Sequence, residues 1–201
     1  MNVNTGRTVE NDLPRPILIG YRATGKSTLA ADLAQIIGCR TIDADDAFEV
    51  ACGCSIASFI GERGEPAFRD AETALLRDLL GQPDAILATG GGVILRPENR
   101  LLLQQAGRPV IWLTAPVTEI RRRLAADPTT CDRRPALSGG DVLDEVEQAL
   151  DQRERLYREV ADTTFDTTGV ERNVLVASVC HWLTEWQPPE TAGWSGGSGK
   201  Q

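Results

Sequence analysis

The sequence is poor in the residue types that mark several classes of protein. It contains one histidine, and only two of its 21 basic residues are lysines. No apolar run approaches the roughly 18–20 residues of a membrane-spanning helix, and residues 1–14 lack the apolar core of a signal peptide. With a net charge of −8, the chain also lacks the basic surplus of a general nucleic-acid binder. We therefore expect a cytoplasmic protein with no membrane or nucleic-acid partner.

Cysteine usage agrees with that expectation. Five cysteines form an odd number, and without a secretion signal they indicate free thiols in a reducing compartment. Cys52 and Cys54 form the one close pair, and neither a second pair nor a nearby histidine accompanies them. Incidental or structural thiols are therefore favoured over a metal site.

What is present indicates one globular α/β domain. The length of 201 residues, with 41% hydrophobic and 25% charged residues, suits a single domain. Short apolar runs alternate with helical patterns, which predicts a central parallel sheet of about five strands with helices on both faces. The expected strands are 17–19, 40–42, 85–88, 110–113 and 163–165. The expected helices are 27–37, 47–51, 55–60, a longer one opened by 64–66, 97–106, 117–125, 141–161 and 170–186. Ser55 is expected to cap the helix at 55–60.

Polar segments flank and interrupt this domain. We expect a flexible N-terminal segment at 1–14, a domain at 15–186, and a disordered Pro-, Gly- and Ser-rich tail at 187–201. Residues 127–140 are polar, contain Pro, Gly and Arg, and predict a mobile lid.

The stretch from Ile17 to Leu29 contains the pattern G-x-x-x-x-G-K-[ST]. An apolar strand precedes it and a helical pattern follows, which is the context that a phosphate-binding P-loop requires. The glycine-rich backbone can direct successive N–H groups at one anion, and the helix N-terminus adds partial positive charge. The residues expected to bind nucleotide phosphate are Gly20, Ala23, Thr24, Gly25, Lys26, Ser27 and Thr28. The alternative, a chance glycine turn before an ordinary helix, does not explain the agreement of pattern and context.

Two residues of this loop carry distinct chemistry. Lys26 can reach the terminal phosphates of a nucleotide as a mobile point charge, and the Ser27 hydroxyl can ligate Mg²⁺. A chain that uses arginine nearly everywhere else, but lysine here, indicates that this position requires lysine.

Further polar residues follow the other expected strands. In open parallel sheets, ligands bind at the carboxyl ends of the strands, so residues that follow different strands should converge on one rim. Asp43 and Asp45 follow the second strand, where one can hold Mg²⁺ through water and the other can orient or deprotonate an acceptor hydroxyl. An alternative is that an Asp here only caps a helix. Gly90, Gly91 and Gly92 follow the third strand and let a ligand approach bare backbone, with a flexible turn as the alternative.

Two arginines suggest a carboxylate-bearing acceptor. Arg153 falls on the apolar stripe of its helix, between Ala149 and Tyr157, so it either pairs with an internal carboxylate or faces a cleft. Arg69 sits beside the apolar face of its own helix. Guanidinium groups bind carboxylates bidentately, and two of them aimed at one cleft would suit such a substrate.

Six segments, in order, give the chain a resemblance to a known family. They are G-Y-R-A-T-G-K-S-T from Gly20, D-A-D-D-A-F-E from Asp43, G-E-P-A-F-R-D-A-E from Gly64, T-G-G-G-V from Thr89, R-R-P-A-L from Arg133 and R-E-R-L-Y-R-E-V-A-D from Arg153. Together they resemble the shikimate kinases, P-loop kinases that move the terminal phosphoryl group of ATP to the 3-hydroxyl of shikimate. The resemblance covers about 16–182.

The resemblance implies specific roles. It assigns phosphate binding to Lys26 and Mg²⁺ binding to Ser27 and, through water, to Asp43. Asp45 would contact the shikimate hydroxyls and act as the suggested base. Contacts with the shikimate carboxylate fall to Arg69 and Arg153, and the triple glycine lines that site. Arg134 in the lid would reach the transferred phosphate, and Arg123 would stack on adenine.

The chain departs from the family pattern at a few points. Ala23 stands where the family usually has glycine, and its methyl group restricts the loop backbone. The lid is a few residues longer than usual, so that Arg133 competes with Arg134 for the phosphate contact. Arg121 and Arg122 leave the register of Arg123 open, and the second adenine contact, near 169–172, is not placed.

We therefore predict a monomeric, Mg²⁺-dependent and ATP-dependent shikimate kinase, with a substrate region at about 43–75. A gluconate-type kinase is one alternative, since its acceptor is also a polyol carboxylate. A nucleotide-binding regulator that has lost catalysis is another, although it would be expected to lose Lys26, Asp45 or a substrate arginine.

Overall fold

The computed structural model describes residues 13–126 and 142–188, with the side chains of the second range described from Val146 onward. The predicted lid at 127–140 lies outside these residues, as do nearly all of the predicted terminal segments 1–14 and 187–201.

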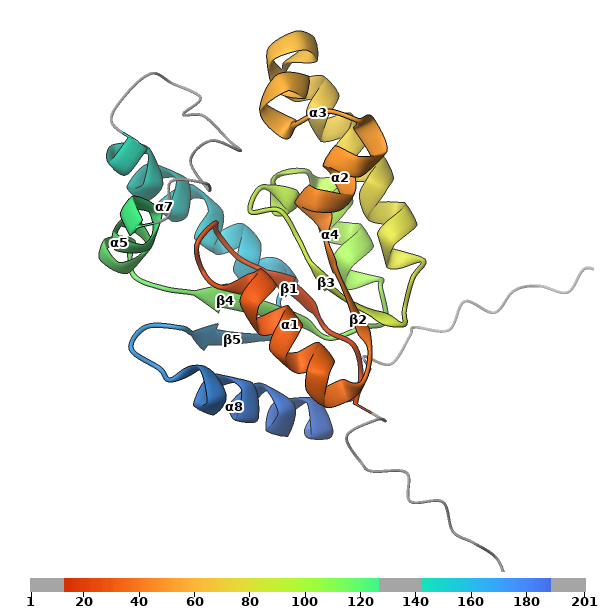
Figure 1. Ribbon diagram of the computed structural model, residues 1–201, viewed down its shortest axis with the longest axis vertical. Helices are drawn as coiled ribbons and strands as arrows, with labels where there is room; N and C mark the ends of the chain where they lie inside the picture. The colour runs from red at the N-terminus through yellow and green to blue at the C-terminus, as the bar shows by residue number, and fades with distance from the viewer. Residues whose placement is uncertain (1–12, 127–141, 189–201) are drawn as a thin grey trace, which may run out of the picture.

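A five-stranded parallel sheet forms the centre of the molecule (Figure 1). Its strands are β1 (Ile17–Ile19), β2 (Arg40–Asp43), β3 (Ala85–Ala88), β4 (Val110–Thr114) and β5 (Thr163–Asp166). They lie in the order β2-β3-β1-β4-β5, and every neighbouring pair is parallel. The predicted sheet is confirmed, and each expected strand is found within one residue of its predicted bounds.

Helices connect the strands. In the described residues they are α1 (Lys26–Ile37), α2 (Ala44–Cys52), α3 (Ile56–Leu80), the 3₁₀ turn η2 (Val93–Leu95), α4 (Pro97–Gln104), α5 (Val117–Ala126), α7 (Val142–Val160) and α8 (Arg172–Glu185). The helix expected at 47–51 begins earlier, at Ala44, because the Asp43 side chain caps it. The turn η2 was not predicted from the sequence.

Side chains alternate between the two faces of the sheet, because successive residues of a strand point in opposite directions. In β4, Ile111 and Leu113 pack in a cluster with α1 and α8, whereas Val110 and Trp112 pack in a cluster with α3, α4 and α7. Strand β1 follows the same rule, with Leu18 in the first cluster. Burial on both faces explains why the central strands are continuous apolar runs.

The region expected to bind the second substrate is an arm built from α2 and α3 (Figure 1). Ser55 caps the start of α3, as predicted, by accepting a hydrogen bond from the Ser58 N–H at 3.1 Å. Inside α3, Gly64 has φ 81° and ψ 159° and breaks the helix into two parts just before Pro66. Phe48 on α2 packs edge-on against Phe59 and Phe68, so an aromatic cluster joins α2 to both parts of α3.

No helix in the described ranges is both long and apolar enough to cross a membrane.

Candidate active site

The P-loop connects β1 to α1, and its conformation depends on two glycines. Gly20 has φ 143°, and a Cβ there would lie 2.3 Å from the carbonyl oxygen of Leu113. Gly25 has φ 89° and occupies the N-cap of α1, where it offers no side chain to the first helical turn. That turn also carries no acidic residue and no side-chain cap, so its N–H groups and partial positive charge can act on an anion.

Lys26 lies inside this loop. Its ammonium group donates to the carbonyls of Gly20 and Tyr21, both at 2.9 Å, and the residue is 9% exposed. The Thr24 hydroxyl also donates to the Tyr21 carbonyl, at 2.8 Å. The loop therefore holds a buried positive charge at the N-terminus of α1, as a phosphate site needs. Thr28 is exposed on the first turn of α1.

Ser27 and Asp43 meet at the rim. The Ser27 hydroxyl donates to Asp43 Oδ2 at 2.5 Å. The other carboxylate oxygen, Oδ1, accepts from the backbone N–H groups of Asp45 and Asp46, at 3.0 and 3.4 Å. Asp43 is thus a helix cap, the alternative considered for it, and its second carboxylate oxygen also accepts from the P-loop serine. A hydroxyl and a carboxylate oxygen at one point are the oxygen ligands that Mg²⁺ prefers.

Asp45 lies on the first turn of α2 and is partly buried. It lines a narrow crevice between α2, α3 and the end of β3, together with Phe68, Glu72, Thr89 and Gly90. The structure therefore brings Asp45 to the triple glycine, as the convergence of strand ends predicted.

Arg69 is held by two carboxylates of its own helix. Its guanidinium group contacts Glu72 at 2.7 Å and Glu65 at 3.0 Å. Burial alone would lower the pKa of Arg69, but these two carboxylates outweigh it and raise the pKa. The guanidinium therefore stays charged. A Cβ on Gly92 would lie 2.5–2.9 Å from three atoms of this group, so any side chain at this position would displace the guanidinium.

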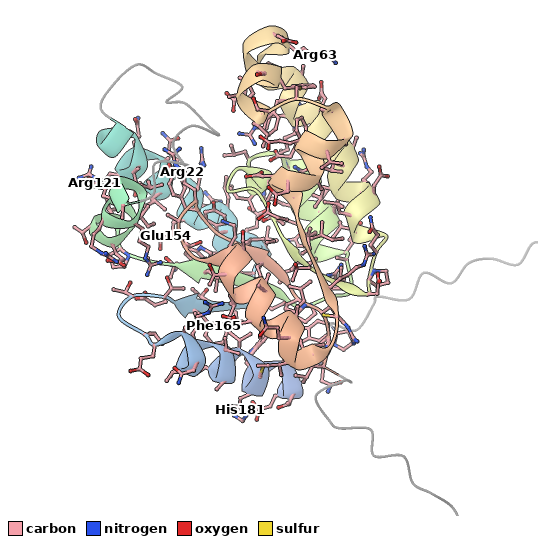
Figure 2. All side chains as sticks on the ribbon, viewed as in Figure 1. Arg22, Arg63, Arg121, Glu154, Phe165 and His181 are labelled. Carbon is pink, nitrogen blue, oxygen red and sulfur yellow. The ribbon has the colours of Figure 1, made fainter. Side chains whose placement is uncertain are left out.

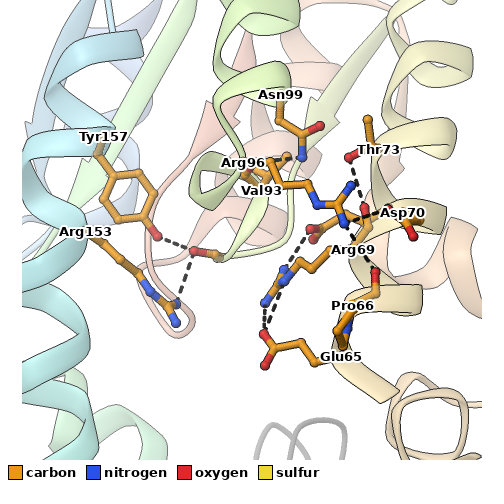
Figure 3. Close-up of polar contacts among 12 residues, drawn as sticks. Glu65, Pro66, Arg69, Asp70, Thr73, Val93, Arg96, Asn99, Arg153 and Tyr157 are labelled. Carbon is orange, nitrogen blue, oxygen red and sulfur yellow. Dashed lines mark hydrogen bonds and ion pairs between the residues drawn. The ribbon is translucent and has the colours of Figure 1, made fainter. Parts of the chain in front are cut away.

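Arg153 approaches from the other side. Figure 3 shows Arg153 and Tyr157 on α7 reaching towards one carbonyl, while Arg69 extends from α3 on the opposite side. That carbonyl belongs to Gly91, and it accepts from Arg153 Nη1 at 3.4 Å and from the Tyr157 hydroxyl at 2.5 Å. The Arg153 guanidinium also lies over the Tyr21 ring, 5.4 Å from its centroid. The two predicted carboxylate-binding arginines therefore flank the triple glycine.

Arg123 is the arginine of α5 that reaches the P-loop. Its Nη1 donates to the Ala23 carbonyl at 3.1 Å and to the Thr167 hydroxyl at 2.9 Å, and its Nη2 donates to the Thr167 carbonyl at 2.8 Å. Arg122 pairs with Glu119, as Arg123 also does, and Arg121 pairs with Glu147. Of the three neighbouring arginines, Arg123, which was chosen from the sequence, is therefore the one that lies between the P-loop and the segment after β5.

Arg172, within the range considered for the second adenine contact, forms an ion pair with Asp32 on α1. Thr167 was not predicted from the sequence, where the one available signal was its place just after the last expected strand; the structure shows that it is buried. Arg133 and Arg134 lie outside the described residues.

The single histidine of the chain, His181, lies far from this site. Figure 2 places Arg22 on the loop between β1 and α1 and Arg63 at the far end of the α3 arm, with His181 on α8 at the opposite side of the molecule.

Comparison with known proteins identifies the family. The sequence model of the family described as shikimate kinase matches residues 22–184. The chain belongs to the shikimate kinase family.

Individual members of the shikimate kinase family support the assignment. The shikimate kinase of Rhodopirellula baltica is 42% identical over 174 residues, which cover 85% of this chain and 92% of the relative. The shikimate kinase of Nitratidesulfovibrio vulgaris is 42% identical over 151 residues, covering 75% and 85%. The resemblance inferred from the six motifs is confirmed.

Solved structures agree. The shikimate kinase of Acinetobacter baumannii in complex with shikimate has a TM-score of 0.79 at 31% identity, over 87% of this chain and 95% of the other. A gluconokinase from Sinorhizobium meliloti has a TM-score of 0.51 at 13% identity, over 85% and 91%. The likeness to gluconokinase is one of fold alone.

Proposed function

We propose that this member of the shikimate kinase family transfers the γ-phosphoryl group of ATP to the 3-hydroxyl of shikimate, giving ADP and shikimate 3-phosphate. The observation that carries the proposal is the placement of Arg69 and Arg153 on either side of the triple glycine, next to a P-loop. A carboxylate between them would meet two charged donors close to the phosphate site. Relatives with this name match most of the chain, which supports the same conclusion.

ATP would occupy the P-loop. Lys26 and the N–H groups at the start of α1 would bind the β- and γ-phosphates, with Gly20, Ala23, Thr24, Gly25 and Thr28 shaping the loop. Hydrogen bonds to Ala23 and Thr167 hold the Arg123 guanidinium beside the P-loop, and Arg123 would stack on adenine, as the family resemblance implies.

The oxygens of Ser27 and Asp43 fit Mg²⁺. Ser27 would ligate the ion and Asp43 would hold it through water. Bound there with ATP, Mg²⁺ would neutralise negative charge on the phosphates.

The acceptor would lie between the α2–α3 arm and α7. Arg69 and Arg153 would hold its carboxylate, and Asp45 would orient the attacking hydroxyl and accept its proton. Arg134 would contact the transferred phosphate, as the family resemblance implies. Catalysis would then rest on positioning and charge neutralisation by Lys26, Asp45 and Arg134.

The decisive measurement is ADP release with ATP, Mg²⁺ and shikimate, compared with gluconate and with no acceptor. Shikimate-dependent release is expected. Release with gluconate only would contradict the acceptor assignment and leave the P-loop assignment intact. Nucleotide binding without turnover on either acceptor would favour the non-catalytic regulator.

A pair of variants tests the role of Asp45. Asp45→Asn removes a base at the acceptor and should lower kcat by about 10²–10⁴-fold. Asp46→Asn is the matched control, because Asp46 is the next residue on α2 and is exposed. It should change kcat less than about twofold, since exposed substitutions away from a site have small effects. Equal losses in the two variants would contradict the role assigned to Asp45.

A further inference from the structure

Tyr157 is a buried polar group for which the proposed mechanism has no use. It is 0% exposed, and its ring stacks on Trp112 with a centroid separation of 5.6 Å and an interplanar angle of 16°. Its hydroxyl donates to the Gly91 carbonyl at 2.5 Å, at the short end of the range for such hydrogen bonds. Phenylalanine would fill this position in the core equally well. The hydrogen bond from the hydroxyl to the Gly91 carbonyl therefore requires an explanation.

The target is a peptide with few restraints of its own. Gly91 lies in a run of three glycines, where no side chain limits rotation of the backbone. Its position must therefore be set by contacts. On one side a Cβ on Gly91 would lie 3.2 Å from the Arg22 backbone nitrogen and 3.4 Å from the Gly20 carbonyl oxygen, so this residue packs against the P-loop. On the other side its carbonyl faces α7.

Arg153 depends on the same carbonyl. The hydrogen bond from Arg153 Nη1 to the Gly91 oxygen is long, at 3.4 Å, whereas the bond from Tyr157 is short. Tyr157 follows Arg153 by one helical turn, so the two side chains meet one acceptor from the same face of α7 (Figure 3). The stronger bond fixes the acceptor, and the weaker bond then places the guanidinium.

We propose that Tyr157 is a positioning residue for the acceptor site. Its hydroxyl holds the Gly91 peptide between the P-loop and α7, and this peptide sets the position of Arg153. The inference rests on the proposed function for the identity of the acceptor. Tyr157 touches neither reacting group in this account, and it acts through Gly91 and Arg153.

The test is Tyr157→Phe, which keeps the ring and its stacking on Trp112 and removes one hydroxyl. The KM for shikimate should rise about tenfold, the usual effect of losing one buried hydrogen bond, while the KM for ATP should change less than twofold. Amide hydrogen exchange at residues 91–93, measured without substrates, should become about tenfold faster because the glycine turn has lost its anchor.

Val160→Ala is the matched control for a loss that is only structural. Val160 is 4% exposed, lies on the same helix and belongs to the same apolar cluster as Tyr157. Its truncation should lower the melting temperature without raising the KM for shikimate relative to that for ATP.

Each outcome is decisive. An unchanged shikimate KM in folded Tyr157→Phe, equal rises in both KM values, or the same pattern in Val160→Ala would overturn the proposal. Absence of shikimate turnover in the wild type would contradict the proposed function instead, and unchanged amide exchange would still overturn the role of Tyr157. If Tyr157→Phe does not fold, Trp112→Phe loosens the stacked ring and leaves the hydroxyl in place. It should raise the shikimate KM about threefold by weakening the same bond, and an unchanged KM would overturn the proposal.

Discussion

At the scale of single residues, Ala23 stands out by its backbone. Its φ of 61° is the only positive value at a non-glycine position in the described residues. The left-handed region costs an L-residue roughly 1–2 kcal/mol, because Cβ approaches the backbone. The Ala23 carbonyl is tied to Arg123, so the loop keeps this conformation although alanine disfavours it. The departure from glycine noted in the sequence therefore carries a strain that the sequence did not reveal.

Ala23→Gly should stabilise the protein. Glycine adopts positive φ without the Cβ penalty, and this gain exceeds the entropy that glycine adds to the unfolded chain, so the free energy of unfolding should rise by up to about 1 kcal/mol. Urea unfolding measures this change. Ala31→Gly is the control, since Ala31 is exposed on α1 and its replacement should lower stability by about 1 kcal/mol. A loss of stability in both variants would show that the Ala23 backbone is not strained.

At the scale of elements, α3 depends on one glycine. Gly64 separates the part of the helix that starts at Ser55 from the part that carries Arg69. Its φ of 81° and ψ of 159° fall in a region that is essentially restricted to glycine. Because the two parts of α3 run in different directions, the aromatic cluster can pack against α2 while Arg69 keeps its place beside the triple glycine.

Gly64→Ala should therefore destabilise the protein by about 1–3 kcal/mol and raise the KM for shikimate, because the arm would repack around a different angle. The control is Gly61→Ala, on the same helix, where a Cβ meets no atom within 4 Å and φ is not positive. It should stabilise by about 0.5–1 kcal/mol. Urea midpoints and shikimate kinetics on the pair make the comparison, and equal behaviour would contradict the requirement for glycine at 64.

The strands and helices were the part of this molecule that the sequence predicted best. Local patterns predicted all five strands, the P-loop and the Ser55 cap, because apolar runs, glycine spacing and caps depend on neighbours in the sequence. The candidate site was found by the rule that strand ends converge. The bond from Tyr157 to Gly91, 66 residues apart, and that from Arg123 to Thr167, 44 apart, depend on distances between packed segments. Such distances are set by the whole core, so local pattern could not supply them.

At the scale of the whole molecule, charge balance determines how stability responds to acid. Acidic residues outnumber basic ones, 29 to 21, so many carboxylates contribute to acid unfolding. Glu119 is distinct among them. Hydrogen bonds from Arg122 and Arg123 lower the pKa of Glu119 from 4.5 to about 2. Because Arg123 also holds the P-loop, this carboxylate links the acid response of the fold to the candidate nucleotide site.

The contribution of ionised Glu119 to stability should appear as a difference between the pH profiles of the wild type and Glu119→Gln. A lowered pKa in the folded state means that ionised Glu119 stabilises the fold fully above about pH 4.5, and that this contribution is lost as the pH falls towards about 2. The wild type should therefore be more stable than Glu119→Gln at pH 6, and the gap should shrink steadily between pH 4.5 and 2. Urea midpoints at half-unit intervals measure it at constant ionic strength, since salt screens an exposed pair. A gap that stays constant down to pH 2 would mean that the pKa of Glu119 is the same in the folded and unfolded chains. The link between the α5 arginines and the P-loop would then have to rest on the hydrogen bonds of Arg123 to Ala23 and Thr167 alone.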